Sequence, residues 1–147
     1  MIARGDGYLL QMASAAGLLN QIGDAAYSAT KHAAVGFAES LAITHGGQGI
    51  KVSVICPLYV ATTLIGYADA AEAAELPRVL TPEQVADAVL EGVRREMFLI
   101  LPHPDVATYI RHKANDTDRW IGAMRKLRSR IIDEIGTTRL EDMHRLV

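Results

Sequence analysis

The sequence predicts an α/β fold built on a parallel sheet with crossover helices. Three short apolar runs, at residues 8–14, 50–57 and 97–102, are separated by two longer segments with helical character, and a helical tail follows. Strands and helices that alternate along a chain are typical of parallel strands joined by right-handed crossovers. We therefore expect about three parallel strands, helices between them and a helical C-terminal extension.

Composition places the chain among ordinary globular domains. It has 147 residues, of which 50% are hydrophobic and 22% are charged, enough to bury a real core. The formal net charge of −2 creates no field that would attract nucleic acid or anionic lipid, so we expect neither partner. No apolar run is long enough for a membrane span and the N-terminus does not resemble a signal peptide, which favours a cytoplasmic protein.

Cysteine and histidine usage argues against disulfides and metal. Cys56 is the only cysteine, and its apolar surroundings, "KVSVICP", favour a buried small side chain over a reactive thiol. The five histidines are scattered without the paired spacing of metal ligands. We expect no metal site.

The first strand and the helix after it are the clearest elements. The run "YLLQMAS" at residues 8–14 follows the turn "GDG" and predicts a buried strand that carries Ser14 at its C-terminal tip. Residues 25–45 are rich in alanine, contain no proline and hold only one glycine, Gly36, which predicts a helix of about five turns. The glycine cluster at residues 46–49 ends that helix.

The second strand is predicted at residues 50–57, "IKVSVICP", because it is rich in β-branched residues and ends at Pro57. Its nearly continuous apolar character is typical of a strand with both faces covered. The stretch from residue 58 to 80 has mixed character: a turn, an alanine-rich segment that could form a short helix, and then Pro77. We interpret it as a loop that covers a site.

A second long helix and a third strand follow. In "TPEQ", Thr81 caps the helix, Pro82 takes its first turn and Gln84 completes a capping box, and the helix should end near Arg95. The run "MFLILP" then predicts the third strand. The helical tail carries one apolar stripe, expected to pack on the domain or on a partner subunit: Trp120, Ile121, Met124, Leu127, Ile131, Ile132 and Ile135.

Tyr27, Lys31 and Ser14 are the residues that could carry chemistry. Tyr27 and Lys31 are four residues apart on the predicted helix, so both side chains lie on one face. A tyrosine ionises near pH 7 only if its pKa falls by about three units, and an ammonium about 4 Å away in an effective dielectric near 20 supplies about that energy. Ser14, at a strand tip, could polarise a substrate oxygen. The alternative is a turn serine and an accidental Tyr-x-x-x-Lys on a solvated face.

These three residues occur within longer stretches that are similar to a known protein family. Ser14 followed by Ala16 and Gly17, then "YSATKHAAVGFAESLA" and "VSVICPLYVATT", resembles the C-terminal half of a short-chain dehydrogenase/reductase. The resemblance covers about residues 7–102 and is weaker in the tail. It implies a Rossmann-type fold that transfers a hydride between NAD or NADP and a small alcohol or carbonyl substrate.

The resemblance also implies roles for individual residues. Tyr27 matches the general acid/base, Lys31 matches the residue that lowers its pKa and bonds the nicotinamide ribose, and Ser14 matches the residue that holds the substrate oxygen. Residues 64–80 match the variable lid over the substrate. The positions that match cofactor contacts are Tyr27, Lys31, Pro57, Leu58, Val60 and Thr62.

Three departures from the family pattern stand out. Ala13 replaces a frequent second serine, and Leu58 replaces a glycine that lets the backbone approach the nicotinamide. The glycine-rich phosphate turn of the family does not occur, because the cluster at residues 46–49 follows a helix and precedes a strand. We therefore expect residues 1–103 to form a catalytic half without the dinucleotide-binding half, and residues 104–147 to form a helical extension. We also expect the chain by itself to bind cofactor weakly and to be inactive or impaired.

Two alternatives stay open. In the first, the chain is a non-catalytic remnant that acts as a binding or oligomerisation module. In that case the first strand would have an unpaired edge. The helix that carries Tyr27 also has a face of small residues that matches the dimer-forming surface of the resembling family, at Ala29, Ala33, Gly36 and Ser40. We therefore expect a homo-oligomer or association through this helix.

The second alternative is a basic tail helix that binds membrane or nucleic acid. Its cationic positions are Arg111, His112, Lys113, Arg119, Arg125, Lys126, Arg128 and Arg130. Acidic residues interleave with them, so a solvated polar face opposite the Trp120 stripe is the favoured interpretation.

Overall fold

The computed structural model describes residues 1–73, 76 and 78–146. Its centre is a parallel sheet with the strand order β1 (Gly7–Met12), β2 (Ile50–Ile55) and β5 (Leu99–Ile100). Gly7 lies opposite Ile50 and Met12 lies opposite Ile55, so β1 and β2 pair along their full length. The predicted α/β class and all three predicted parallel strands are confirmed.

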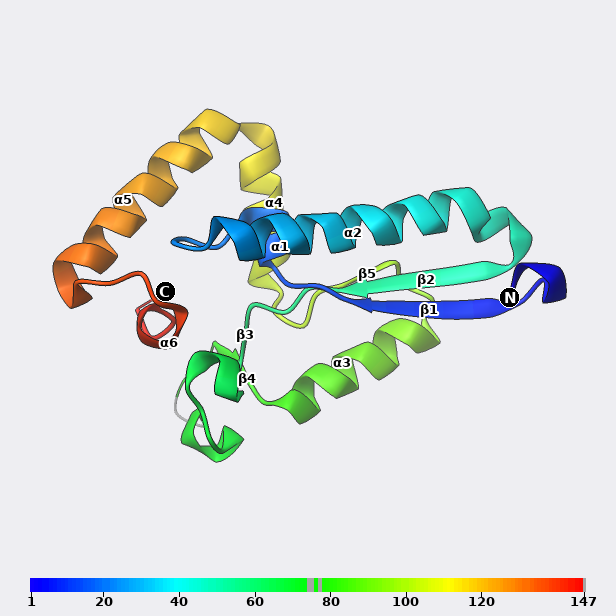
Figure 1. Cartoon of the computed structure of the whole chain (residues 1–147), viewed down its shortest axis with the longest axis horizontal. Coiled ribbons are helices and arrows are strands. Elements are labelled where there is room, and N and C mark those ends of the chain that lie inside the picture. Colours follow the sequence, from blue (N-terminus) through cyan, green and yellow to red (C-terminus); the bar gives the residue numbers. More distant parts are fainter. Residues whose placement is uncertain (74–75, 77, 147) are drawn as a thin grey trace.

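One long helix covers each face of the sheet (Figure 1). Helix α2 (Ala25–His45) lies along one face and α3 (Pro82–Arg94) lies along the other. The α2 side buries Ala13, Val35, Ala38, Ile50, Val52, Val54 and Cys56. The α3 side buries Ile55, Val85 and Ile100. Successive residues of β2 thus point to opposite layers, as expected for a strand with both faces covered.

Local chemistry explains where the two long helices begin. The Asp24 carboxylate accepts a hydrogen bond of 2.8 Å from the Tyr27 N–H and caps α2. Thr81 and Gln84 form the predicted capping box at the start of α3, with Pro82 in the first turn. Both helices have the predicted extents, to within one residue at the end of α3.

The segment after β2 is more ordered than the sequence indicated. It contains a parallel pair of two-residue strands, β3 (Tyr59–Val60) and β4 (Val79–Leu80), and two 3-10 helices, η3 (Thr63–Ile65) and η4 (Ala70–Ala73). The alanine-rich stretch predicted as a short helix contains η4. Residues 74 and 75, which belong to that stretch, and Pro77 lie outside the described residues.

Short elements complete the sheet domain. They are η1 (Ile2–Arg4), α1 (Ala16–Leu19) and η2 (Gly46–Gln48), none of which the sequence predicted as a helix. Helix α1 follows Ser14 directly and packs against α2. Gly17 permits this approach, because a Cβ atom built there would lie 2.5 Å from the backbone oxygen of Lys31.

The tail is helical, as predicted. It forms α4 (Asp105–Asn115), α5 (Thr117–Ile135) and α6 (Leu140–Met143), and α6 returns to lie beside the segment of β3 and β4 (Figure 1). Helix α4 joins the sheet domain through Val106, which is fully buried, and through Lys113, whose ammonium donates a 2.6 Å hydrogen bond to the Leu18 carbonyl. Among the helices of the described residues, none combines the length and the apolar character required to cross a bilayer.

Candidate active site

Ser14 lies at the carboxyl edge of the sheet, beside the loop that follows β2. Backbone hydrogen bonds from Ala13 to Ile55 (2.9 Å) and from Ala15 to Pro57 (2.8 Å) continue the β1–β2 pairing past the ends of both strands. Ser14 is only 8% exposed, and its hydroxyl oxygen accepts a 3.1 Å hydrogen bond from the Ala16 N–H. The hydroxyl hydrogen therefore remains available to a ligand oxygen.

Tyr27 and Lys31 lie together on the first two turns of α2. The Lys31 ammonium lies over the Tyr27 ring, with Nζ 5.5 Å from the ring centroid, and both residues are half-buried. Among the hydrogen bonds of the described residues, none involves the Tyr27 hydroxyl or the Lys31 ammonium, whereas the Tyr27 backbone is held by the Asp24 cap. The helix thus presents a phenol and a cation together, with both polar groups open to a ligand.

The loop of residues 20–24 connects α1, which follows Ser14, to α2, which carries Tyr27. The Gln21 N–H donates a 2.7 Å hydrogen bond to the buried Ser28 hydroxyl, which in turn donates to the Asp24 carbonyl at 2.9 Å. Gln21 and Ile22 line two neighbouring cavities, one of about 290 Å³ that reaches Ser14 and one of about 330 Å³ that reaches Tyr27. The structure brings Tyr27 and Lys31 together, and the cavity that Ser14 lines shares Gln21 and Ile22 with the cavity that Tyr27 lines.

The predicted cofactor positions after β2 form one restrained segment. Pro57 follows the strand, and the Leu58 N–H donates to His103 Nδ1 at 3.1 Å. Val60 belongs to β3, and the Thr62 hydroxyl donates to the Val60 carbonyl at 3.2 Å. The side chain of Leu58, which replaces the family's glycine, lines the cavity beside Ser14. All four positions lie at the same edge of the sheet as Ser14.

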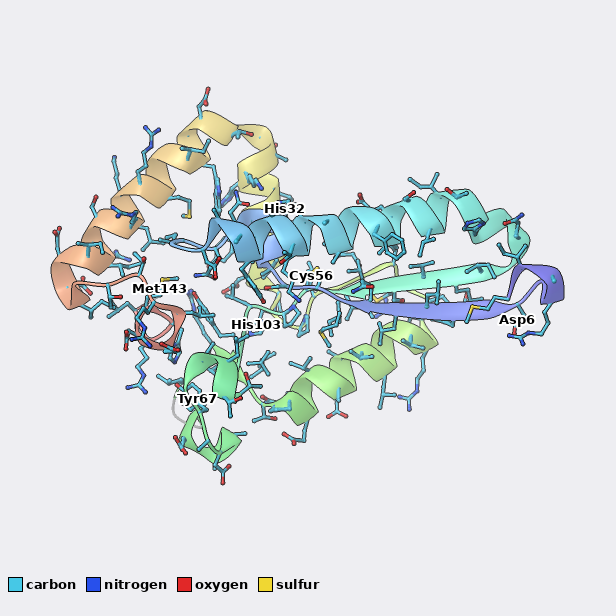
Figure 2. All side chains as sticks on the ribbon, in the orientation of Figure 1. Asp6, His32, Cys56, Tyr67, His103 and Met143 are labelled. Carbon is cyan, nitrogen blue, oxygen red and sulfur yellow. The ribbon has the colours of Figure 1, made fainter. Side chains whose placement is uncertain are left out.

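His103 fixes this segment in place (Figure 2). Its Nδ1 accepts from Leu58, so the ring proton is on Nε2, which lies 3.1 Å from the Tyr59 carbonyl and 3.2 Å from the Arg78 carbonyl. The ring is 7% exposed, and its burial is the main reason that the pKa of His103 is lowered, with the two carbonyls opposing that shift. No spacing in the sequence marked this histidine, because its three partners lie 25 to 45 residues away.

Cys56 lies in the core of the sheet domain. Cys56 is fully buried, and burial raises the pKa of its thiol to about 11, so the thiol stays protonated near neutral pH. This confirms the interpretation of Cys56 as a small buried side chain. In the parts of the chain that the structure describes, no group of three or more His, Cys, Asp or Glu side chains could hold a metal ion.

The tail contributes walls that sequence reasoning did not assign to a site. Tyr109, Trp120, Met124 and Leu127 line the cavity beside Ser14, together with residues from the sheet domain. The predicted apolar stripe was the signal for this role: Ile131 is fully buried and Trp120 is half-buried, whereas Ile121 and Ile135 are 43% and 37% exposed. The stripe therefore packs on the domain in part, as predicted.

The C-terminal segment also contacts both Tyr67 and the loop of residues 20–24. The buried Tyr67 hydroxyl lies 2.9 Å from His144 Nε2, and His144 Nδ1 lies 3.0 Å from the Leu140 carbonyl. Because Nδ1 must donate to that carbonyl, Nε2 accepts from Tyr67. Gln21 approaches the Met143 sulfur at 3.9 Å. Figure 2 shows Tyr67 and Met143 on adjoining segments at this end of the molecule.

Comparisons with known proteins agree with this architecture. The sequence model described as short chain dehydrogenase matches residues 1–73. Epidermal retinol dehydrogenase 2 of Homo sapiens is 34% identical over 106 residues, a match that covers 69% of this chain and 34% of the relative. The chain therefore spans about a third of that relative's length.

Two solved structures have a similar fold. One is a short-chain dehydrogenase from Sphingobium yanoikuyae in complex with NADPH, with a TM-score of 0.62, 26% identity and coverage of 87% of this chain and 47% of that one. The other is a short chain dehydrogenase/reductase from Burkholderia phymatum in complex with NAD, with a TM-score of 0.64, 27% identity and coverage of 80% and 50%. Each match includes about half of the solved chain.

Proposed function

Because the chain belongs to the short-chain dehydrogenase/reductase family, we propose that it provides the catalytic half of an oxidoreductase that transfers a hydride between NAD or NADP and an alcohol or carbonyl substrate. Tyr27 is the proposed general acid/base, Lys31 its cationic partner and Ser14 the residue that orients the substrate oxygen. The observation that carries this proposal is the Lys31 ammonium 5.5 Å from the centroid of the Tyr27 ring, where Tyr27 lines a cavity and neither polar group has a hydrogen-bond partner among the described residues.

The chemistry follows from the residue types. In carbonyl reduction the Tyr27 hydroxyl gives its proton to the substrate oxygen, and in alcohol oxidation the phenolate takes that proton back. The positive charge of Lys31 stabilises the negative charge that the phenol oxygen gains when its proton leaves. Ser14 donates its free hydroxyl hydrogen to the same substrate oxygen.

The proposed reaction needs one substrate oxygen that reaches both Ser14 and Tyr27. The two residues line two cavities that share Gln21 and Ile22. The loop that carries them has left-handed backbone conformations at both ends, at Asn20 (φ 71°) and Gly23 (φ 83°). Rotation at these two positions would displace Gln21 and Ile22 and open the two cavities to each other.

The residues present fit the nicotinamide end of the cofactor. Lys31 has an ammonium open to ribose hydroxyls, and the segment from Pro57 to Thr62 offers restrained backbone groups at the same sheet edge. When bound, the nicotinamide dinucleotide supplies or accepts the hydride. The four positions after β2 and the Tyr27–Lys31 pair are therefore proposed as its contacts: Tyr27, Lys31, Pro57, Leu58, Val60 and Thr62.

A second candidate is a non-catalytic module that associates with another chain. The observation in its favour is exposed apolar surface: Phe37 and Ile43 on α2 are 60% and 84% exposed, and Leu10 and Met12 on β1 are 45% and 51% exposed. Single exposed apolar side chains are common on protein surfaces. Two such side chains on one helix and two on one edge strand favour an association surface.

Cofactor titration separates the two candidates. We expect the full gene product that contains this chain to bind NADH or NADPH saturably, and the 147-residue chain alone not to saturate at micromolar cofactor, because its proposed contacts meet only the nicotinamide end. The fluorescence of the reduced cofactor measures its binding to each of the two proteins. Saturable binding by the chain alone would contradict the module, and absence of binding by the full gene product would contradict the oxidoreductase.

A further inference from the structure

The cavity beside Ser14 has an apolar wall and a cationic rim. Its volume is about 290 Å³, at the lower end of the range for small-molecule sites. Its apolar lining includes Leu19 and Leu58 from the sheet domain, and Trp120 and Leu127 from α5. Such a wall favours a ligand with an aliphatic or aromatic body.

The charges at this cavity have one sign. Among the described residues that line it, Arg78 and Arg130 are the only charged ones, so no described carboxylate offsets them within the lining. Arg78 lies 3.7 Å from the Asp105 carboxylate, with 53% of its side chain exposed. The four ion pairs among the described residues do not include Arg130. Arg130 thus brings a positive charge to an apolar cavity without a described acidic partner.

We infer that this cavity selects substrates with an apolar body and an anionic group, such as hydroxy acids or keto acids, and that Arg130, assisted by Arg78, meets the anion. The inference rests on the proposed function, because it places the reacting oxygen at Ser14. The apolar body lies along Trp120 and Leu127, and a guanidinium offers the paired N–H donors that match a carboxylate.

Trp120 allows the inference to be tested without turnover. It is the only tryptophan of the chain and it lines this cavity, so its emission reports occupancy. We expect octanoate to bind about fivefold more tightly than octan-1-ol, because the two share an apolar chain and only octanoate carries a charge. Added salt should weaken octanoate binding and leave octan-1-ol binding nearly unchanged.

Matched arginine variants locate the anion. Arg130→Gln should remove the preference for octanoate, while Arg128→Gln should keep it, because Arg128 lies on the same helix but lines a different cavity. Leu127→Gln should weaken the binding of both ligands. Trp120 lines the cavity beside Ser14 and a neighbouring cavity, whereas Leu127 lines only the first, so this result would assign the Trp120 response to the cavity beside Ser14.

Three results would overturn the inference: no Trp120 response to either ligand, equal affinity for the two ligands, or loss of the preference in Arg128→Gln instead of Arg130→Gln. None of these measurements uses NAD(P) or depends on Tyr27. Their failure is therefore distinguishable from failure of the proposed oxidoreductase function.

Discussion

His103 connects three segments at the carboxyl edge of the sheet. It accepts from the Leu58 N–H and donates to the Tyr59 and Arg78 carbonyls, so it ties the proposed nicotinamide segment to the start of β4. This pattern requires the neutral ring. A proton on Nδ1 would turn its acceptor into a donor that faces the Leu58 N–H.

The same geometry predicts a pH-dependent stability. Because burial lowers the pKa of His103 below its ordinary 6.5, the unfolded chain takes up a proton at a higher pH than the folded chain does. The free energy of unfolding should therefore fall as the pH drops below about 6.5, and level off below the lowered pKa. Urea unfolding at pH 7.5 and at pH 5.5 measures this loss.

The control compares two histidines. His103→Gln should lose part of the pH dependence, whereas His112→Gln, at an exposed position of α4, should keep the dependence of the unaltered chain. Equal pH dependence in all three proteins would show that His103 does not resist protonation in the fold.

Tyr27 and His103 show how far single residues could be predicted. The Tyr27–Lys31 pair was predictable because one helical turn alone brings residues four apart together. His103 was not, since its partners are Leu58 before β3, Tyr59 on β3 and Arg78 before β4, all distant along the chain.

At the scale of elements, the close contact between α1 and α2 restrains the helix that carries Tyr27 and Lys31. A Cβ atom at Gly17 would lie 2.5 Å from the Lys31 carbonyl oxygen and 3.1 Å from Val35 Cγ2. These are backbone and buried core atoms, so neither can move away at low cost. Gly17 therefore sets the distance between the helix that follows Ser14 and the helix that carries Tyr27 and Lys31.

Two glycine substitutions test this restraint. Gly17→Ala should lower the free energy of unfolding by about 1–3 kcal/mol through overpacking. Gly36→Ala, in the middle of the same α2 but with open space around its Cβ position, should raise it by about 0.5–1 kcal/mol. Chemical denaturation of both variants gives the two values. If Gly17→Ala were as stable as Gly36→Ala, the close approach of α1 to α2 would be wrong.

Long elements were predictable and short ones were not. Helix α2 has the predicted extent because propensity and the following glycine cluster act locally. The β3–β4 pair was missed because two-residue strands carry no periodicity and pair with residues 20 positions away. Helix α1 was missed because a single turn gives almost no signal.

At the scale of the whole molecule, apolar side chains of β1 and small side chains of α2 are exposed. Strand β1 is an edge of the sheet among the described residues, and Leu10 and Met12 on it are about half exposed. The small-residue face of α2 at Ala29, Ala33, Gly36 and Ser40 is exposed as well. We propose both as association surfaces, which suits either a larger oxidoreductase or an oligomeric module.

The proposed acid/base role of Tyr27 distinguishes these two outcomes, because carbonyl reduction by hydride transfer needs a proton donor at the substrate oxygen. The substitution Tyr27→Phe in the full gene product tests this role, because it removes the hydroxyl group and keeps the ring beside Lys31. Tyr8→Phe is the matched control. The Tyr8 hydroxyl bonds the Ser53 hydroxyl, and Tyr8 lies near the start of β1, at the opposite end of that strand from Ser14.

The deciding measurement is NAD(P)-dependent turnover of these proteins on a panel of alcohols and ketones, including hydroxy and keto acids. We predict that Tyr27→Phe lowers kcat about 10² to 10⁴-fold with cofactor binding retained, and that Tyr8→Phe stays within a few-fold of the unaltered protein. Turnover that is unchanged in Tyr27→Phe, or absent from the unaltered protein, would contradict the account.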